Sequence, residues 1–373
     1  MFCNSIKVKN FRNIEDEEIF FDNGINILIG DNAQGKTNLI EAIYTFALGK
    51  SFKGVKEADL IRFGEDEARI ELTFNTKERS EPQTLTLSLK KGRKRICQLN
   101  GLKIEKLSEM IGIFRAVLFC PEHLALVKEG PAMRRNYLDV AVSQFRPVYL
   151  KALQRYYAIL DQRNKLIKSA EENREAYDST IDLWSAQLAH EAAQISYYRS
   201  IYVKKVGEAV KKYFYDMTGG REIVEMRYIG SAKQQEEEYL DIKRTEEKYM
   251  SLLTASKDRE IYAGSTLYGI HKDDIEIFIG GKSARIFASQ GQQRSLALSM
   301  KLAEASICLE ETGETPVLLL DDVLSELDSG RINYLMSSVN DIQVIISTCE
   351  KADFDGVKKI FVEKGRYYVP SRG

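Results

Sequence analysis

Residues 25–44 read INILIGDNAQGKTNLIEAIY, and this stretch decides the fold of the chain around it. Its first five residues suit a buried strand, and the spacing of the apolar residues after Asn38 predicts a helix. The loop between them is bounded by Gly30 and Gly35 and ends in Lys36-Thr37. This order of strand, glycine-bounded loop and helix is typical of a loop that binds phosphate groups.

The loop contains the groups that phosphate binding requires. Gly30 and Gly35 permit backbone angles that turn successive N–H groups toward one anion, and the start of the helix adds further donors. Lys36 offers a point charge to the terminal phosphates, and Thr37 offers a hydroxyl ligand for Mg²⁺. The alternative is a chance match, which we estimate at about one per cent for a chain of this length. We therefore predict an ATP or GTP site, whose candidate residues are Gly30, Asp31, Asn32, Ala33, Gln34, Gly35, Lys36, Thr37 and Asn38.

The composition limits the class of protein. A chain of 373 residues with 44% hydrophobic residues can form two or three domains, or one large domain with an insertion. The 54 Lys and Arg residues against 55 Asp and Glu give a net charge of −1, which argues against a surface that is basic throughout. Any contact with DNA therefore has to come from a local basic surface, on one chain or assembled in an oligomer.

The sequence also predicts the compartment. Its five cysteines are an odd number without a Cys-x-x-Cys pair, which suits a reducing compartment and argues against zinc or an iron–sulfur centre. Residues 1–9 contain polar residues where a signal peptide needs an apolar block, and the apolar run at 316–320 is too short to span a membrane. We expect a soluble cytoplasmic protein without a membrane partner.

Hydrophobic periodicity predicts a split α/β domain. The alternating pattern at 83–104 indicates a β-meander, and residues 275–279 with 285–287 suggest a hairpin. Between these regions, steps of three and four residues over about 145–214, broken by a polar segment, predict two antiparallel helices. Their apolar stripe is more often core packing than a partner surface. We predict an ATPase head formed by 1–118 and 264–373, with a helical domain inserted at 119–263.

The C-terminal third offers the carboxylates that a phosphate loop needs. Residues 317–320 form an apolar strand that ends in Asp321-Asp322, and such strand ends lie near the phosphate loop in an open α/β sheet. Asp321 would hold Mg²⁺, and Asp322 would orient or deprotonate the attacking water, so Asp322 and Lys36 are the candidate catalytic residues. The alternative is a pair of exposed acids that cap the next helix.

A second anion-binding segment precedes another predicted helix. The segment is Ser289-Gln290-Gly291-Gln292-Gln293-Arg294, in which Ser289 and the backbone of Gly291 stand at the helix N-terminus. The segment Ser325-Glu326-Leu327-Asp328 follows the paired aspartates. Each segment alone is weak evidence, since a serine before a helix is usually an N-cap. The prediction therefore depends on the order and spacing of all the segments together.

In this order the segments resemble the ABC-type ATPase heads of the SMC/Rad50 group, and the match extends from end to end. Within the group, the chain is most similar to the short-armed bacterial DNA-repair members. Its hairpin is far too short for the long arms of other members and lacks the Cys-x-x-Cys of a zinc hook. The segments that resemble the group, besides the loops already quoted, are Lys9–Asn13, Gly49–Lys53, Pro121–Leu124, Val127–Pro131, Arg134–Asp139 and Gly269–Asp274.

The resemblance implies a mechanism and a set of partners. Two heads would enclose two ATP molecules, with Ser289, Gly291 and Gln292 of one head completing the site that Lys36 of the other begins, and with Arg12 near the nucleotide. Hydrolysis, weak and stimulated by DNA, would release this ATP-dependent homodimer. The implied ligands are single- and double-stranded DNA at gaps and junctions, and the implied partners are RecR and, indirectly, the recombinase RecA.

Three positions depart from the pattern of the group. Phe119-Cys120-Pro121-Glu122 stands where ABC proteins usually carry a glutamine, and no switch histidine occurs in Ile345–Glu350. Asp322 replaces the glutamate of most ABC heads; because Asp is one methylene shorter, we predict slow hydrolysis and a long-lived dimer.

Other interpretations remain open at this point. The chain could be the nucleotide-binding subunit of a transporter, although it has Ala288–Gln292 in place of Leu-Ser-Gly-Gly-Gln, or an ATP-gated DNA clamp that does not hydrolyse ATP. The basic run Lys90–Arg95 is a candidate for DNA phosphate contacts, but such a run is usually a solvated turn. His271 is either a site residue or a structural histidine.

Overall fold

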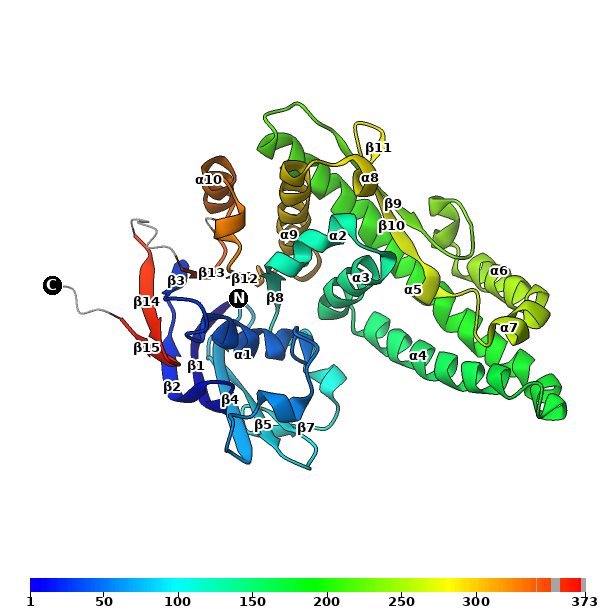
Figure 1. The fold of residues 1–373 in the computed structure, drawn as a ribbon, viewed down its shortest axis with the longest axis horizontal. Helices are drawn as coiled ribbons and strands as arrows, with labels where there is room; N and C mark the ends of the chain where they lie inside the picture. Colours follow the sequence, from blue (N-terminus) through cyan, green and yellow to red (C-terminus); the bar gives the residue numbers. More distant parts are fainter. Residues whose placement is uncertain (340, 350–355, 370–373) are drawn as a thin grey trace. The chain divides into compact units, whose positions relative to one another are not determined.

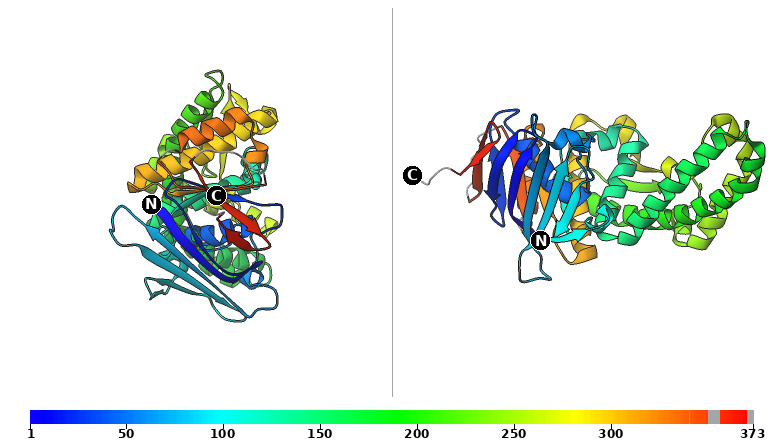
Figure 2. Two further views of the ribbon diagram at one scale, coloured as in Figure 1. Left: turned by 90° about the vertical axis from the view of Figure 1, so that its left-hand side faces the viewer. Right: turned by 90° about the horizontal axis from the view of Figure 1, so that it is seen from below.

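The computed structural model describes residues 1–339, 341–349 and 356–369, and the chain divides into two compact units (Figure 1). The first unit comprises Met1–Ala125, Asp216–Gly219 and Gln290–Gly373, and the second comprises Leu126–Tyr215 and Gly220–Ser289. Both ends of the chain therefore belong to the first unit, which is coloured blue to cyan and orange to red in Figure 2. The mixed α/β fold predicted from the sequence is confirmed.

A largely parallel sheet forms one layer of the first unit. Its order is β15-β14-β3-β13-β12-β8, and only the pairing of β15 with β14 is antiparallel. Every residue of β12 and β13 is buried, which explains their continuous apolar sequences. The strands are β3 (Ile25–Ile29), β8 (Ala116–Phe119), β12 (Val317–Asp321), β13 (Val344–Thr348), β14 (Lys358–Glu363) and β15 (Arg366–Tyr368).

An antiparallel sheet forms a second layer, with the order β2-β1-β4-β5-β6-β7, and it includes the predicted meander. Helix α1 (Lys36–Leu48) contacts strands of both sheets, so it is buried on almost every side, and Gly49 ends it with a φ of 76°. The strands are β1 (Phe2–Phe11), β2 (Ile14–Phe20), β4 (Glu67–Asn75), β5 (Gln83–Lys90), β6 (Ile96–Leu99) and β7 (Leu102–Ile104).

Two further helices complete the first unit, α9 (Gln290–Thr312) and α10 (Ser329–Ser338). Helix α9 contacts β8, and the carboxylate of Asp328 caps α10 by accepting a hydrogen bond from the Arg331 N–H at 2.9 Å. Short 3₁₀ helices in the two units are η1 (Glu57–Leu60), η2 (Leu107–Glu109), η3 (Pro121–Leu124), η4 (Glu236–Leu240), η5 (Ile270–Lys272) and η6 (Leu324–Glu326).

The second unit is mainly helical and contains the hairpin of α4 (Pro147–Lys168) and α5 (Arg174–Met217). Three side-chain hydrogen bonds join these helices, and their partners run in opposite sequence order, so the helices are antiparallel: Tyr149 with Arg199, Arg155 with Glu191, and Arg163 with Ser185. The other helices are α2 (Ala125–Lys128), α3 (Pro131–Phe145), α6 (Ile242–Ala255), α7 (Lys257–Ala263) and α8 (Ala284–Phe287), and the strands are β9 (Val224–Ile229), β10 (Asp274–Ile279) and β11 (Lys282–Ser283).

Two details differ from the sequence predictions. Residues 285–287 belong to helix α8 and not to a strand, because β11 ends after two paired residues. We predicted that the ATPase head resumes at residue 264. In the structure the second unit continues to Ser289, because β10 pairs with β9 along its whole length. Within the described residues, no helix is long and apolar enough to cross a membrane.

Candidate nucleotide-binding site

The phosphate loop surrounds a cavity of about 220 Å³ together with two residues from elsewhere in the chain. All seven residues from Asn32 to Asn38 line it, along with Lys53 and Asp322. The Lys36 Nζ donates to the carbonyl oxygens of Gly30 at 2.5 Å and Asp31 at 2.8 Å. The structure therefore brings the predicted water-activating residue, Asp322, to the same cavity as the predicted phosphate-binding lysine.

The two loop glycines are required for different reasons. Gly35 has a φ of +121°, a conformation that L side chains rarely adopt. Gly30 does not have a positive φ, so our explanation from backbone angles is wrong for that residue. Gly30 is required because a Cβ at this position would lie 2.3 Å from the carbonyl oxygen of Val362. Within the loop, Ala33 is the non-glycine residue with a left-handed φ, of 63°.

Neighbouring segments fix the shape of the loop from outside. The Gln34 carbonyl accepts hydrogen bonds from the Gly365 N–H at 2.8 Å and from the Asn13 side chain at 3.1 Å. The Tyr367 hydroxyl donates to the Gly35 carbonyl at 2.8 Å. Asn38 donates to the Asn13 side-chain oxygen at 2.8 Å. The loop is therefore held in place by β15 and by the turn between β1 and β2.

The candidate metal ligands lie next to each other. The Thr37 hydroxyl donates to the Asp321 carboxylate at 2.9 Å, and the Ser347 hydroxyl donates to the same oxygen at 2.7 Å. Burial raises the pKa of Asp321, and these two hydroxyl hydrogen bonds oppose that rise. Oxygen atoms of a hydroxyl and a carboxylate at one point are the donor set that suits Mg²⁺.

Asp322 takes an unusual backbone conformation at the end of β12. Its φ is 53°, in the left-handed region where Asp is tolerated better than most residues. Its N–H donates to the Ser347 hydroxyl at 2.9 Å and approaches the Ser347 carbonyl at 3.2 Å. Ser347 on β13 thus contacts both aspartates, because β13 lies between β12 and the strand that leads into the phosphate loop.

Arg12 binds the helix that follows the loop. Its guanidinium makes two hydrogen bonds to Glu41 of α1, at 2.9 and 2.7 Å, and a third to the Asp59 carbonyl at 3.1 Å. The Glu41 side chain is fully buried and also accepts a hydrogen bond from the Ser51 hydroxyl. Arg12 is not among the residues that line the cavity in the described parts of the chain.

Lys53 is a cavity residue that sequence reasoning missed. Its Nζ lies 3.8 Å from Glu41 and 3.5 Å from the Asn38 side-chain oxygen. Because Arg12 already makes both short bonds to Glu41, the charge of Lys53 is only weakly compensated there. The available signal was the basic segment Gly49–Lys53 immediately after α1, which we noted only as a resemblance.

The second anion-binding segment is joined to the loop after the paired aspartates. Arg331 donates to the Gly291 carbonyl at 3.0 Å and to the Ser295 hydroxyl at 2.8 Å, and it pairs with Asp328. Arg294 pairs with Glu326 at 2.7 Å. Within the described residues, Gly291 and Gln292 do not line the cavity of the phosphate loop, and Ser289 directly precedes α9.

The segments after β8 and β13, where the sequence differs from the pattern of ABC proteins, make hydrogen bonds of their own. After β8, the Cys120 N–H donates to the His123 ring nitrogen at 3.2 Å, and burial, reinforced by Lys301, lowers the pKa of His123 well below its ordinary value. After β13, the Cys349 thiol donates to the Asn32 side-chain oxygen at 2.8 Å and lies 3.3 Å from the Lys36 Nζ. Glu350 lies outside the described residues.

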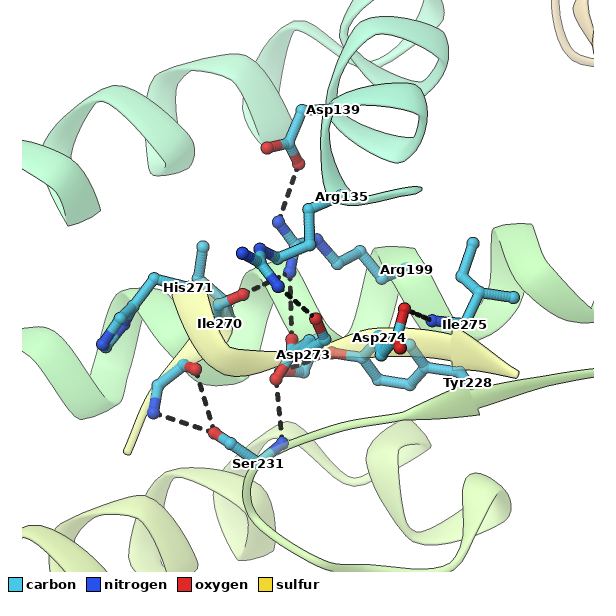
Figure 3. A network of polar contacts seen from close by, with 12 residues as sticks. Arg135, Asp139, Arg199, Tyr228, Ser231, Ile270, His271, Asp273, Asp274 and Ile275 are labelled. Atoms are coloured by element: carbon cyan, nitrogen blue, oxygen red, sulfur yellow. Dashed lines mark hydrogen bonds and ion pairs between the residues drawn. The ribbon is translucent and has the colours of Figure 1, made fainter. Parts of the chain in front are cut away.

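The segment Gly269–Asp274 forms a polar network inside the second unit (Figure 3). Arg199 donates to Asp273 at 3.0 Å, to Asp139 at 2.8 Å and to the Ile270 carbonyl at 2.8 Å. The His271 ring bonds to the Tyr156 hydroxyl at 2.7 Å and to the Thr266 carbonyl at 3.1 Å. Burial lowers the pKa of His271 to about 4, so this histidine is a neutral, hydrogen-bonded part of the structure.

Comparison with known proteins gives the family. The sequence profile described as RecF/RecN/SMC N terminal domain matches residues 2–364. The DNA replication and repair protein RecF of Geobacillus thermodenitrificans is 37% identical over 369 residues, which cover 99% of this chain and 97% of that protein. RecF of Bacillus cereus is 39% identical over 359 residues, covering 96% of this chain and 94% of that protein.

Solved structures agree with the sequence comparison. The structure of the recombination mediator protein RecF with ATP, in the RecFOR pathway, has a TM-score of 0.91 at 34% identity and covers 99% of this chain and 98% of that chain. A crystal structure of an Smc head bound to a domain of ScpA has a TM-score of 0.57 at 16% identity, covers 99% of this chain and 97% of that one, and shows a likeness of fold alone. This chain belongs to the RecF family of DNA replication and repair proteins.

Proposed function

We propose that this chain is an ATP-dependent, DNA-binding recombination mediator. Two copies dimerise around two ATP molecules on DNA and help to load a recombinase at gaps and single-strand to double-strand junctions during repair and replication restart. The observation that carries the proposal is the full-length likeness to RecF, including the structure of RecF with ATP, combined with the cavity that Lys36 and Asp322 share. The solved structure of RecF with ATP is assigned to the RecFOR pathway, and this assignment supports RecR as a partner. The family resemblance supports RecA as the recombinase.

The residues of the cavity and those near it have separate roles in this proposal. Lys36 and the N–H groups of the phosphate loop bind the terminal phosphates, and Lys53 adds a second positive charge at the same cavity. Asp322 orients the attacking water or accepts its proton. Ser289, Gly291 and Gln292 complete the site of the other copy. Arg12 acts by holding α1 and the segment Ser51–Lys53 through Glu41.

Mg²⁺ fits the oxygen atoms that meet beside the loop. Thr37 and Asp321 would hold it, directly or through water, since their oxygen atoms are already 2.9 Å apart. Bound there, the ion would neutralise phosphate charge. Mg²⁺ usually keeps several waters and takes few protein ligands. Two protein oxygens therefore suffice, and the described residues hold no group of three or more His, Cys, Asp or Glu side chains placed to bind a metal.

Sedimentation of the purified chain with ATP, ADP and DNA in all combinations tests the function. We expect dimers with ATP on DNA and monomers with ADP, because only ATP has a γ-phosphate to present to the second copy. A transporter subunit would require a membrane partner and would not respond to DNA. Dimers that form equally well with ADP, or that ignore DNA, would contradict the proposal.

The basic run Lys90–Arg95 gives a prediction about DNA binding. Lys90 pairs with Glu67, Lys91 with Asp66 and Arg95 with Glu57, whereas Arg93 and Lys94 have no such partner within the described residues. The double charge reversal of Arg93 and Lys94 should weaken binding to all DNA sequences and flatten the salt dependence of the binding constant.

The matched control reverses Lys103 of β7, which pairs with Glu105 just after the same strand and should leave DNA affinity unchanged. The binding constants are measured by fluorescence anisotropy at several salt concentrations. Equal salt slopes for the double reversal and the unmodified chain would remove this turn from the DNA-binding surface.

A further inference from the structure

One face of the second unit exposes large apolar side chains beside a cavity. The face is formed by β10 and α8, which line a cavity of about 480 Å³. Helix α8 has only four residues, of which Ala284 is buried, while Ile286 is 72% exposed and Phe287 is 65% exposed. Two neighbouring side chains of this size on a surface are characteristic of a contact with another protein.

The same face holds two side chains of opposite charge that are not paired within the described residues. Glu276 on β10 and Arg285 on α8 both line the cavity, and both are exposed. Within the described residues, neither side chain makes an ion pair or a hydrogen bond. By contrast, Arg134 and Asp274 on the same cavity pair with each other at 2.7 Å. A surface with one unpaired acid and one unpaired base is complementary to a second copy of itself across a two-fold axis.

The chain connects this face to the segment that meets the second copy in the proposed dimer. Phe287 stands two residues before Ser289, and two residues of chain span at most about 7 Å. If Ser289 and Gly291 of one copy reach the nucleotide of the other, α8 lies at the edge of the contact between the two copies. This step rests on the proposed function, since it takes the dimer from there.

We propose that Glu276, Arg285, Ile286 and Phe287, here called the α8 face, form a two-fold interface with a second copy of this chain. Ile286 and Phe287 of each copy pack on the α8 face of the other, and Arg285 of each copy pairs with Glu276 of the other. The apolar pair supplies association energy beyond the shared nucleotides, and the charges fix the register of the two copies.

The first test removes the apolar pair from the full-length chain. Ile286→Ser with Phe287→Ser should raise the dissociation constant of the dimer with ATP, Mg²⁺ and DNA at least thirtyfold, equivalent to about 2 kcal/mol, because each lost side chain counts twice in a two-fold contact. Leu183→Ser, which removes an apolar side chain that is 61% exposed on α5, is the matched control and should leave the dimer unchanged. Sedimentation velocity measures the dimer, and binding of a fluorescent ATP analogue to the monomer should be equal for all three chains.

The outcomes separate this interface from the proposed function. An unmodified chain that stays monomeric with ATP and DNA would overturn the proposed function and the interface with it. A dimeric unmodified chain together with an equally dimeric double variant would overturn the interface alone.

The second test uses the charges. Arg285→Glu and Glu276→Arg should each weaken the dimer about tenfold. A mixture of the two variants should restore it, because every contact across the two-fold axis then again joins a positive and a negative side chain. A change that acts only within one chain cannot be repaired by mixing. A mixture that dimerises no better than either variant alone would therefore overturn the assigned register.

Discussion

Asp322→Asn should lower ATP hydrolysis at least about a hundredfold while ATP still binds, so that the ATP-bound dimer persists. The substitution removes the carboxylate that lines the cavity of the phosphate loop but keeps the size of the side chain. Asparagine also tolerates the left-handed φ of 53° at this position, so we expect no loss of folding. Phosphate release in a single turnover measures the rate, and sedimentation velocity measures the lifetime of the dimer.

Lys36→Arg is the comparison variant. The Lys36 ammonium fits between the Gly30 and Asp31 carbonyls, at 2.5 and 2.8 Å, and a planar guanidinium cannot reproduce this geometry. We expect Lys36→Arg to impair the hydrolytic cycle without trapping a dimer. If Asp322→Asn hydrolyses ATP as fast as the unmodified chain, Asp322 is vestigial, and the protein is an ATP-gated clamp whose release does not depend on hydrolysis.

The parts of the site that follow one another in sequence were predictable. The phosphate loop is a local pattern, and the end of an apolar strand locates Asp321 and Asp322 in any parallel sheet. The contact between Thr37 and Asp321, at 2.9 Å, follows from this arrangement. The fold class could be predicted for the same reason, since buried strands and helices leave different periodicities in the sequence.

The parts that depend on tertiary contacts were not predictable. Lys53 reaches the cavity because the buried side chain of Glu41 holds the segment Ser51–Lys53 in place. The spacing of residues in the sequence does not reveal that this glutamate is buried. Gly30 is required by the approach of Val362, which lies more than three hundred residues away in the sequence. Arg285-Ile286-Phe287 has the composition of a strand, but β11 pairs over only two residues before the chain turns into α8.

Arg199→Met should lower the free energy of unfolding of the second unit by about 3–5 kcal/mol, the largest loss of stability we expect from one substitution in this chain. Arg199 is fully buried and joins Asp273, Asp139, the Ile270 carbonyl and the Tyr149 hydroxyl. Methionine keeps the apolar stem but leaves the fully buried carboxylate of Asp273 without its counter-charge. The single tryptophan, Trp184 on α5, reports unfolding of this unit by fluorescence in urea.

The loss should depend on pH. Burial raises the pKa of Asp273, and Arg199 opposes that rise together with hydrogen bonds from Tyr228 and Ser231. Without Arg199 the folded-state pKa of Asp273 rises further above its unfolded value. A carboxyl group with a raised folded-state pKa disfavours folding increasingly as the pH rises through the interval between the two values. The difference in stability between Arg199→Met and the unmodified chain should therefore be smaller at pH 5 than at pH 7.5.

The matched control is Arg174→Met on the same helix. Arg174 pairs with Asp178 at 3.0 Å, and both side chains are more than half exposed, so the loss should be far smaller than for Arg199→Met and should change little with pH. Equal losses for the two variants would mean that the Asp273 network does not hold the second unit together. In that case the segment Gly269–Asp274 would serve a role other than stability. His271, whose ring bonds to the Tyr156 hydroxyl beside this network, would again be a candidate site residue.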